Sequence, residues 1–356
     1  MKGDALKAIS NHLIALISNS ETGMAKMIEN ISFSTTGDGT FTKQKTGIHK
    51  LWPYDLLVEV SAVSVNPVDL KLAAQNANGK RILGYDAVGT VVEKGSSVRG
   101  VEIGDRVFYA GTTVRDGAHQ KLQLVDHRIA AHAPKNLTDA EAAAIPLTAL
   151  AAWELLFERM GFVPEKDGNK GQQLLMINGA GGVGSIASQI AKWAGFKVTA
   201  TSSPKNFEWL KDNGVKECVD YHQDLILEAG ARKFDAVVSF YDISDYFPAV
   251  AKVVKPFGKV GTIVETKKDL PMNLLKNNNV DFFWEYMFAK TEQQMQIATQ
   301  GAILAKVADM LDAGILHTTL TKEFTGGIST ETLAQAFQRV AKRAIGKTVI
   351  SGGVKE

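Results

Sequence analysis

The chain has 356 residues, of which 45% are hydrophobic, and a formal net charge of +2 at pH 7. This length suggests two domains with ample apolar residues for their cores. The near-neutral charge argues against a surface dedicated to nucleic acids or membranes. A single cysteine, Cys218, excludes an intrachain disulfide framework and a thiolate zinc cluster, so we expect a reducing, cytoplasmic setting.

Residues 1–23 contain only a brief apolar patch and lack the core of a signal peptide. Along the whole chain, no apolar run reaches the roughly 20 residues that a membrane span requires. We interpret residues 1–23 as an extension outside the fold, with Met24 as an alternative start.

The segment from Lys26 to Tyr109 has the pattern of β structure. Residues 56–63 alternate as a half-buried strand, and shorter strands are predicted at 87–92 and 106–109. The sequence Asn66-Pro67-Val68-Asp69 interrupts this pattern. Short strands separated by regular turns predict a compact, barrel-like β domain rather than a parallel sheet.

The pattern changes near Leu137. Thr138-Asp139-Ala140-Glu141 has the residues of a capping box, and two predicted helices follow, interrupted by Pro146, the second over 148–160. Strands and helices then alternate, with strands at 174–177, 197–201, 216–219, 235–239 and 258–264 and helices at 184–194, 205–213, 223–230 and 245–254. This alternation predicts an α/β fold with a doubly wound parallel sheet.

The last third of the chain departs from this alternation. A further strand is predicted near 280–283, and a long helix is predicted over 292–313. The tail, residues 323–350, returns to a strand–helix–strand pattern. We expect this tail to fold back on the first domain.

A glycine-rich turn follows the apolar run 174–177. Gly179, Gly181 and Gly184 fit the pattern G-x-G-x-x-G. The first glycine permits a tight turn, the second lets the backbone approach a pyrophosphate, and the third lets the helix pack on its strand. Any tight strand-to-helix turn can use glycines in this way. The strand before and the helix after the turn favour a dinucleotide site, because the start of a helix binds anions.

Several motifs are spread along the chain from about Lys26 to Val349. They are Val65-Asn66-Pro67-Val68-Asp69, Gly84-Tyr85-Asp86-Ala87-Val88-Gly89, Gly104-Asp105-Arg106-Val107, the segment 144–154, the glycine turn, Trp284-Glu285-Tyr286-Met287-Phe288 and Gly346-Lys347-Thr348-Val349. Together they resemble the medium-chain dehydrogenase/reductase superfamily. The resemblance is closest to its quinone oxidoreductase branch, and within it to the subgroup called zinc-type alcohol dehydrogenase-like.

The resemblance implies two domains. A GroES-like catalytic domain would comprise residues 24–148 and 318–356, and a Rossmann domain of residues 149–317 would bind NADPH. A homodimer formed through the edges of the Rossmann sheets is also implied. The β-rich start, the alternating middle and the returning tail agree with this arrangement.

The subgroup's description suggests zinc, so the ligand positions need to be compared. Zinc alcohol dehydrogenases that resemble this chain have cysteine at the position of Asn66, histidine and glutamate at Tyr85 and Asp86, and cysteine at about Thr148. Asp86 alone keeps a metal-binding side chain, whereas a catalytic zinc needs about three protein ligands. The four-cysteine structural lobe of those enzymes is also missing. We therefore expect no metal.

Three histidines remain as candidate ligands. His119, His127 and His132 are spaced along predicted loops and strands. Histidines in such places are more often surface or capping residues, so they do not change the expectation.

The expected cofactor is NADPH. A dinucleotide fold that prefers NADH usually has Asp or Glu about twenty residues beyond the glycine turn, where it binds the ribose 2′-hydroxyl. Ser203 stands at that position and Lys205 follows, and both suit a 2′-phosphate, although a solvated turn with a surface lysine is the alternative. By the resemblance, Tyr221 flanks the same phosphate. The further residues that it places at the cofactor are Thr148, Gly182, Val183, Ser202, Phe240, Val264 and Lys347.

The candidate catalytic residues are Asn66, Asp69, Lys71 and Tyr85, which the resemblance places beside the nicotinamide. Asp69 either acts in the site or simply caps a local turn. Val68 replaces the proton-relaying serine or threonine of alcohol dehydrogenases, so alcohol oxidation lacks its Lewis acid and its proton path. The remaining chemistry suits hydride transfer to a quinone or an α,β-unsaturated carbonyl, with a proton from Tyr85, Lys71 or water.

Two other functions remain open from the sequence. One is a zinc-dependent alcohol dehydrogenase, which stoichiometric zinc and alcohol turnover would support. The other is a non-catalytic NADPH- or RNA-binding protein of the zeta-crystallin type. Because the chain has no basic run or RNA-stacking aromatic motif, we expect a small-molecule substrate and no nucleic-acid partner.

Overall fold

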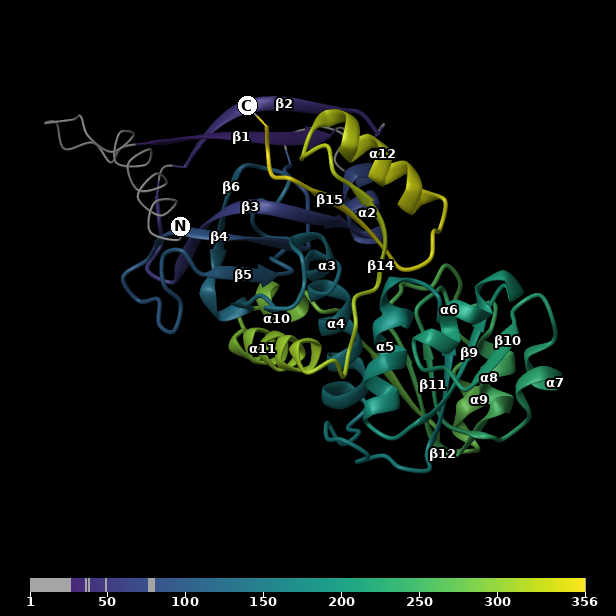
Figure 1. The fold of residues 1–356 in the computed structure, drawn as a ribbon. Helices are drawn as coiled ribbons and strands as arrows, with labels where there is room; N and C mark the ends of the chain where they lie inside the picture. The colour runs from purple at the N-terminus through teal and green to yellow at the C-terminus, as the bar shows by residue number, and fades with distance from the viewer. Residues whose placement is uncertain (1–26, 36, 38, 49, 76–80, 356) are drawn as a thin grey trace, which may run out of the picture.

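The computed structural model describes residues 27–35, 37, 39–48, 50–75 and 81–355. They form two units, each built around one large sheet (Figure 1). One unit combines the purple and blue start of the chain with its yellow end, and the other is teal and green. The predicted N-terminal extension lies outside the described residues.

The first unit contains a seven-stranded sheet. Its order is β14 (Leu320–Phe324), β15 (Lys347–Ser351), β3 (Asp55–Val65), β4 (Ala87–Lys94), β5 (Arg106–Tyr109) and β7 (Ala130–His132), with β6 (Leu122–Asp126) paired to β3. An antiparallel hairpin of β1 (Ile28–Thr35) and β2 (Phe41–Ile48) accompanies it. Helices α2 (Pro67–Gln75), α3 (Asp139–Ala143) and α12 (Thr330–Ala341) belong to this unit. The predicted β-rich domain is confirmed.

The second unit contains a six-stranded parallel sheet between layers of helices. Its order is β10 (Glu217–Asp220), β9 (Lys197–Ser202), β8 (Gln173–Ile177), β11 (Phe234–Ser239), β12 (Val254–Thr262) and β13 (Asp281–Trp284). Leu174 and Met176 of β8 pack in one apolar core with α5 (Gly182–Trp193). Leu175 and Ile177 pack in another with α8 (Phe247–Val253), because successive side chains of a strand point to opposite faces. The remaining helices are α6 (Phe207–Asp212), α7 (Leu225–Ala229) and α9 (Asn273–Lys276).

The strand order reverses at the centre of this sheet. From β8 the chain moves outward to β9 and β10, and then it returns to β11 on the other side of β8. In open α/β sheets, ligands bind outside the carboxyl ends of the strands at such a switch point. The doubly wound parallel sheet predicted from the alternation is confirmed.

A buried helix connects the two units. The helix predicted over 148–160 begins earlier, as α4 (Pro146–Trp153), because proline suits the first turn of a helix. It continues as a π-helical segment over Glu154–Arg159. Residues Asp139–Arg159 are long and apolar enough to cross a membrane, yet they are almost wholly buried, as in the core helix of a folded domain.

The helix predicted over 292–313 is wrong at its start. A short helix, α10 (Ala289–Glu292), ends there, and α11 (Ala298–Asp312) begins six residues later. Gln294 and Gln296 between them have φ of 53°, which a right-handed helix does not adopt.

Helix α11 packs against the first unit rather than the second sheet (Figure 1). A Cβ on Gly301 would lie 2.5 Å from the carbonyl oxygen of Arg128, so glycine permits this close approach. Part of the range 149–317 therefore lies against the first sheet, and the domain boundaries stay a prediction.

Two elements of the second unit differ slightly from the prediction. The strand predicted over 258–264 is β12, which begins at Val254 and ends at Thr262. The helix predicted over 205–213 starts as a 3₁₀ turn at Pro204–Asn206 before α6. The proline and the exposed turn favour the tighter start.

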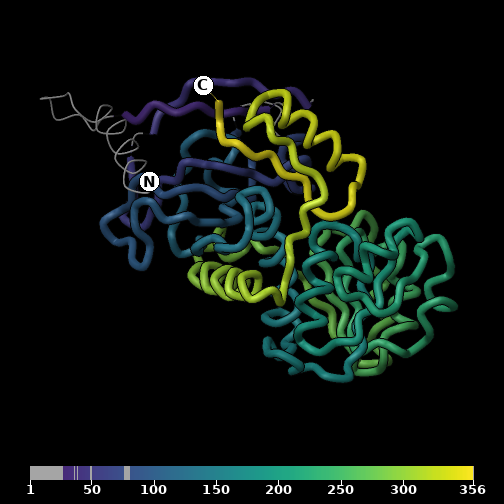
Figure 2. The backbone as a smooth tube through the Cα atoms, in the orientation of Figure 1, coloured from purple at the N-terminus to yellow at the C-terminus, as the bar shows by residue number. Residues whose placement is uncertain are grey.

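The tail returns to the first sheet, as expected from the sequence. Strand β15 pairs antiparallel with β3 and parallel with β14. Figure 2 shows the yellow tube passing beside the second unit before it crosses the first. There the Gly346 N–H donates to the carbonyl oxygen of Ala180 over 3.0 Å, and Gly346 forms a β-bridge with Gly181. The tail thus holds the glycine turn against the first unit.

Candidate active site

The glycine turn between β8 and α5 depends on close backbone contacts. A Cβ on Gly179 would lie 2.6 Å from the Cβ of Ala200, and one on Gly184 would lie 2.5 Å from the carbonyl oxygen of Gly179. Glycine alone fits these positions. Helix α5 begins at Gly182 with Gly181 as its cap, so its first N–H groups have no side-chain acceptor. This is the arrangement that binds an anion.

Two more predicted cofactor residues lie beside the start of α5. A Cβ on Gly182 would lie 2.9 Å from Cδ of Lys347 and 3.4 Å from Cγ2 of Thr148. Val183, the next residue, is half-buried. The Thr148 hydroxyl donates to the carbonyl oxygen of Ile145 over 3.0 Å. The stem of Lys347, rather than its ammonium group, therefore lies next to the turn.

Hydroxyl groups gather at the end of β9. The hydroxyl of Ser203 donates to Oη of Tyr221 over 3.3 Å, and Tyr221 is 45% exposed. Ser202 is buried and accepts a hydrogen bond from the Asn206 amide. Lys205 is exposed in the adjoining 3₁₀ turn. The structure thus brings Ser203 and Tyr221 together at an accessible edge, with Lys205 close behind in the chain.

Asp220, at the end of the neighbouring strand β10, forms its hydrogen bonds with His222. The Asp220 carboxylate accepts the backbone N–H of His222 and lies 2.6 Å from its ring Nδ1. These bonds hold the pKa of Asp220 below its ordinary value. The His222 ring in turn packs against the Tyr221 ring, with the centroids 4.0 Å apart and the planes tilted by 32°.

Phe240 and Val264 follow β11 and β12 at the carboxyl edge of the parallel sheet. Asn178, in the glycine turn, donates from its side-chain amide to the carbonyl oxygen of Phe240 over 3.2 Å. The Val264 N–H donates to Oγ1 of Thr262 over 3.3 Å. Carboxyl ends of parallel strands share one edge, so both residues lie on the side of the glycine turn.

Asn66, Asp86 and Lys347 form a buried network, which we call the lysine network. Lys347 Nζ lies 3.0 Å from Oδ2 of Asp86 and also donates to the side-chain oxygen of Asn66. The Asn66 amide donates to the same carboxylate over 2.8 Å, and the Leu147 N–H donates to its other oxygen over 2.7 Å. Burial raises the pKa of Asp86, and the positive charge of Lys347 opposes that rise.

Asp69 holds the start of α2. Its carboxylate accepts the backbone N–H of Asn66 over 2.8 Å and that of Gly84 over 2.9 Å. Burial raises the pKa of Asp69 to about 7, although both hydrogen bonds lower it. Both carboxylate oxygens are used inside the fold, which is the arrangement of a cap.

Tyr85 lies beneath Phe288. It is fully buried, and the two ring centroids are 5.3 Å apart in an edge-to-face contact. Burial raises the pKa of Tyr85 to about 12, with the nearby charge of Arg81 opposing the rise. Within the described part of the chain the hydroxyl finds no acceptor, since the neighbouring Arg81 guanidinium has only donors, so it is an unused donor that solvent does not reach.

Lys71 is the most accessible of the predicted catalytic residues. Its Nζ lies 3.8 Å from Oε2 of Glu265, which directly follows Val264. The two side chains are 51% and 92% exposed. Here α2 of the first unit meets the end of β12 in the second.

A second polar cluster, which was not predicted from the sequence, lies near Tyr85 and includes its neighbour Arg81. Arg81 donates to the carbonyl oxygen of Thr113, and the hydroxyls of Thr113 and Tyr286 both donate to Oε1 of Glu292. These residues come from three distant segments, so no spacing pointed to them. The motif 284–288 was a signal for the segment, but not for its partners.

The residues at the former zinc positions do not fit a metal ion. The polar groups of Asn66 and Asp86 bond to each other and to the Lys347 ammonium, which already supplies a positive charge there. The Thr148 hydroxyl donates to the carbonyl oxygen of Ile145, at the start of its own helix. Within the described part of the chain, no three His, Cys, Asp or Glu side chains are grouped to hold a metal.

The three candidate histidines lie apart from one another. His119 is buried in apolar surroundings, which lowers its pKa to about 3. His127 stacks on the Tyr54 ring, and His132 contacts the Asp105 carboxylate at 3.0 Å. Each therefore has a local environment that is unrelated to the lysine network.

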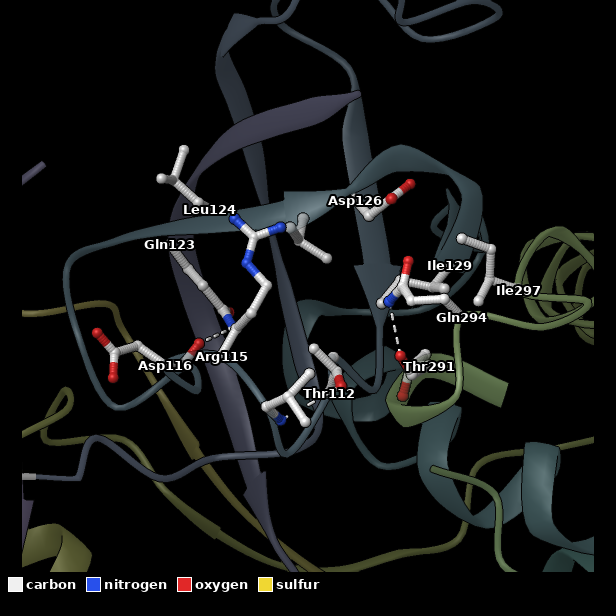
Figure 3. A pocket seen from close by; sticks show the side chains of 13 residues that line it. Thr112, Arg115, Asp116, Gln123, Leu124, Asp126, Ile129, Thr291, Gln294 and Ile297 are labelled. Atoms are coloured by element: carbon white, nitrogen blue, oxygen red, sulfur yellow. Dashed lines mark hydrogen bonds between the residues drawn. The ribbon is translucent and has the colours of Figure 1, made fainter. Parts of the chain in front are cut away.

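A separate cavity of about 120 Å³ lies where the loop 111–116 meets β6 and the α10–α11 connection (Figure 3). On one side, Arg115 binds the Asp55 carboxylate with two hydrogen bonds of 2.8 Å. On the other, the Gln294 amide donates to the carbonyl oxygen of Thr291 over 2.7 Å. None of the predicted site residues lines this cavity.

Two family models match the chain. One is described as an alcohol dehydrogenase GroES-like domain and matches residues 53–135. The other is described as a zinc-binding dehydrogenase and matches residues 213–350. The first range lies in the first unit, and the second covers much of the second unit and the returning tail.

Individual proteins are similar over most of the chain. A zinc-type alcohol dehydrogenase-like protein of Staphylococcus epidermidis is 35% identical, over 84% of this chain and 90% of the relative. The 2-methylene-furan-3-one reductase of Solanum lycopersicum is 32% identical, over 83% of this chain and 71% of the relative. A crystal structure from Rhizobium etli CFN 42, described as a zinc-dependent alcohol dehydrogenase, has a TM-score of 0.84 and 34% identity, covering 92% of this chain and 99% of that chain. The predicted GroES-like and Rossmann-like architecture is confirmed.

Proposed function

Because the chain belongs to the medium-chain dehydrogenase/reductase superfamily, and so is an NAD(P)H-dependent oxidoreductase, we propose that it reduces quinones or α,β-unsaturated carbonyls. We further propose that it uses NADPH and no metal. The single observation that carries this proposal is the closed lysine network at the former zinc positions.

The lysine network bears on the choice of substrate. An alcohol dehydrogenase uses its metal to polarise a carbonyl oxygen, but Asn66, Asp86 and Lys347 are bonded to one another. A quinone or enone already accepts electrons well and needs only hydrogen-bond donors at its oxygen. The name of the Solanum lycopersicum relative describes reduction of such an unsaturated ketone, which supports the proposal.

Several of the chain's own groups fit NADPH, which supplies a hydride when it is bound. The N–H groups at the start of α5 would hold the pyrophosphate. Ser203, Tyr221 and Lys205 would hold the 2′-phosphate, since the nearby acid Asp220 is committed to His222. Phe240 and Val264 would line the nicotinamide end.

Lys71 is the donor that we propose for the substrate's oxygen. It is exposed beside Glu265, where the two units meet at the carboxyl end of β12. Its ammonium group would stabilise the negative charge that develops on the carbonyl oxygen and would supply a proton. Tyr85 is a second unused donor, which a substrate would reach by displacing Arg81 or Phe288. Asn66 would position α2, because its N–H donates to the Asp69 carboxylate and its side-chain amide donates to Asp86.

The proposal is tested by measuring NADPH and NADH oxidation with a panel of quinones, enones and aldehydes. We expect turnover with quinones and enones, faster with NADPH than with NADH, and little turnover with simple aldehydes. Alcohol oxidation that depends on added zinc, with no quinone or enone turnover, would contradict the proposal.

Removing one donor should slow the reaction of enones. Lys71→Met should reduce kcat on enones on the order of a hundredfold, because one donor at a developing oxyanion contributes roughly 3 kcal/mol. NADPH affinity should not change, and quinones should be affected less. Lys268→Met is the control, since Lys268 forms an exposed ion pair with Asp245. If Lys71→Met and Tyr85→Phe are both fully active, the donor assignment is wrong.

We also propose a cytoplasmic homodimer without membrane or nucleic-acid partners. The parallel sheet ends at β10 and β13, whose outer edges are unpaired among the described residues. An edge strand is a surface through which a second copy can pair. Sedimentation of the purified protein tests the dimer.

A further inference from the structure

Two glutamates are buried on neighbouring segments outside the site described above. The segments meet where Arg159 donates to the carbonyl oxygen of Trp284 over 3.0 Å, and the side chains of Glu154 and Glu285 are hydrogen-bonded to each other. Glu154 begins the π-helical segment and is 1% exposed, and Glu285 directly follows β13 and is 6% exposed. Few positive charges are near them. Lys290 Nζ lies 3.2 Å from Glu154 but 2.6 Å from Glu158, and Arg159 Nε lies 4.0 Å from Glu285.

Such a pair holds one proton between two carboxyl groups, because two adjacent buried carboxylates repel each other. Burial and the neighbouring charge of Glu154 raise the pKa of Glu285 to about 8. Burial also raises the pKa of Glu154, with Lys290 opposing the rise. Glu154 accepts a hydrogen bond from Gln300 and lies 3.2 Å from Lys290 Nζ, so the negative charge is best placed on Glu154 and the proton on Glu285.

The glutamate pair is tied to the segment 284–288. The Gln300 amide, on α11, donates to Oε1 of Glu154 over 3.0 Å and to the carbonyl oxygen of Met287 over 2.6 Å. The same segment carries Phe288, which covers Tyr85, and Tyr286, which bonds to Glu292. Its position therefore decides how the wall next to Tyr85 is formed.

We propose that Glu285, through a proton shared with Glu154, is a positioning residue that holds the segment 284–288 over Tyr85. The charged groups that face the pair are Glu158 and Arg159 from the π-helical segment and Lys290 from α10. Loss of the proton leaves two buried negative charges with too few cations, so the segment moves away. A raised pKa means that the shared proton is present below pH 8 and is lost as the pH rises through it.

The activity test rests on the proposed function. With an enone, kcat/KM of the wild type should be about tenfold lower at pH 9 than at pH 7, as for one required protonated group of pKa near 8. Glu285→Gln keeps a neutral donor at every pH, so it should remove this fall. The matched control is Glu158→Gln, which leaves the buried pair intact. This variant should show the same fall in kcat/KM between pH 7 and pH 9 as the wild type. An equal fall in Glu285→Gln would overturn the proposal.

A second readout needs neither cofactor nor substrate. Trp284 adjoins Glu285 and is 45% exposed, so the fluorescence difference between the wild type and Trp284→Phe reports on the segment. It should titrate near pH 8 in the wild type and not in Glu285→Gln. If Glu285→Gln does not fold, Glu154→Gln should move the midpoint to lower pH. A titration as expected in a protein that reduces no quinone or enone would contradict the proposed function alone, whereas no titration would overturn the positioning role.

Discussion

The glycine turn and the lysine network lie side by side, yet the first leaves its polar groups open and the second closes them. At the turn, close backbone packing presents N–H groups that have no side-chain acceptor. In the network, Asn66, Asp86 and Lys347 use their polar atoms on one another. An open group can bind a ligand, whereas a closed one holds two parts of the chain together. We call the glycine turn, which can bind a ligand, the binding half of the site. We call the lysine network, which links two parts of the chain, the fastening half.

The largest effect is expected when the lysine network is broken. Lys347→Met leaves Asp86 buried without its cation, which should lower the free energy of unfolding by about 3–5 kcal/mol. Urea denaturation measures this change. Lys347→Met combined with Asp86→Asn removes both charges and should recover most of the loss. If the double variant loses as much as the sum of its single changes, the pair is not coupled as we describe.

A smaller effect is expected in the binding half. A Cβ on Gly184 would lie 2.5 Å from the carbonyl oxygen of Gly179 and 2.6 Å from that of Asn178. Gly184→Ala should therefore cost about 1–3 kcal/mol of stability and weaken NADPH and NADH alike. Gly326→Ala is the control, because its Cβ would meet a Thr332 methyl group at 3.2 Å and no backbone atom. Thermal unfolding and cofactor titration distinguish the two.

A change confined to one cofactor is expected at the end of β9. Lys205→Ala should raise the Kd of NADPH on the order of tenfold, because it removes a charged contact to the 2′-phosphate. The Kd of NADH should not change. Lys170→Ala, at another exposed lysine, is the control. An equal loss for both cofactors would mean that Lys205 does not contact the phosphate.

No effect is expected from metal removal. The fastening half has its own internal cation in Lys347, so exhaustive treatment with a chelator should leave turnover and Tm unchanged. Loss of activity that zinc restores would place a metal in the site and contradict the comparison.

The binding half could be predicted from the sequence because the residues that form it are close together in the chain. The turn from β8 to α5 lies within a few residues, and the spacing of Gly179, Gly181 and Gly184 records the contacts that require glycine. The parallel, doubly wound sheet was likewise predicted from the alternation of strands and helices. A pattern of this kind needs no knowledge of distant partners.

The contacts of the fastening half were harder to predict from the sequence, because they join residues that are far apart in the chain. Asn66 and Lys347 are 281 positions apart, and Asp86 and Lys347 are 261 positions apart. The polar cluster near Tyr85 is equally non-local, because Thr113 is 179 positions from Glu292. The family resemblance therefore names Lys347 as a candidate residue, but the sequence does not show what its ammonium group binds. Likewise, Tyr85 was expected to face the nicotinamide, and its cover by Phe288 depends on how the segment 284–288 packs. The late start of α11 depends on positive φ at Gln294 and Gln296, which apolar periodicity does not record.

Strand β15 has a consequence for synthesis on the ribosome. It lies between β14 and the end of β3, so residues 62–65 of the longest strand in the first sheet lack their partner on that edge until residues 347–351 have emerged. The parallel sheet, whose strands end at Trp284, is available to fold earlier. The domain that is translated first is therefore completed last, and until then the end of β3 beyond its pairing with β6 stays open to pairing with other nascent chains.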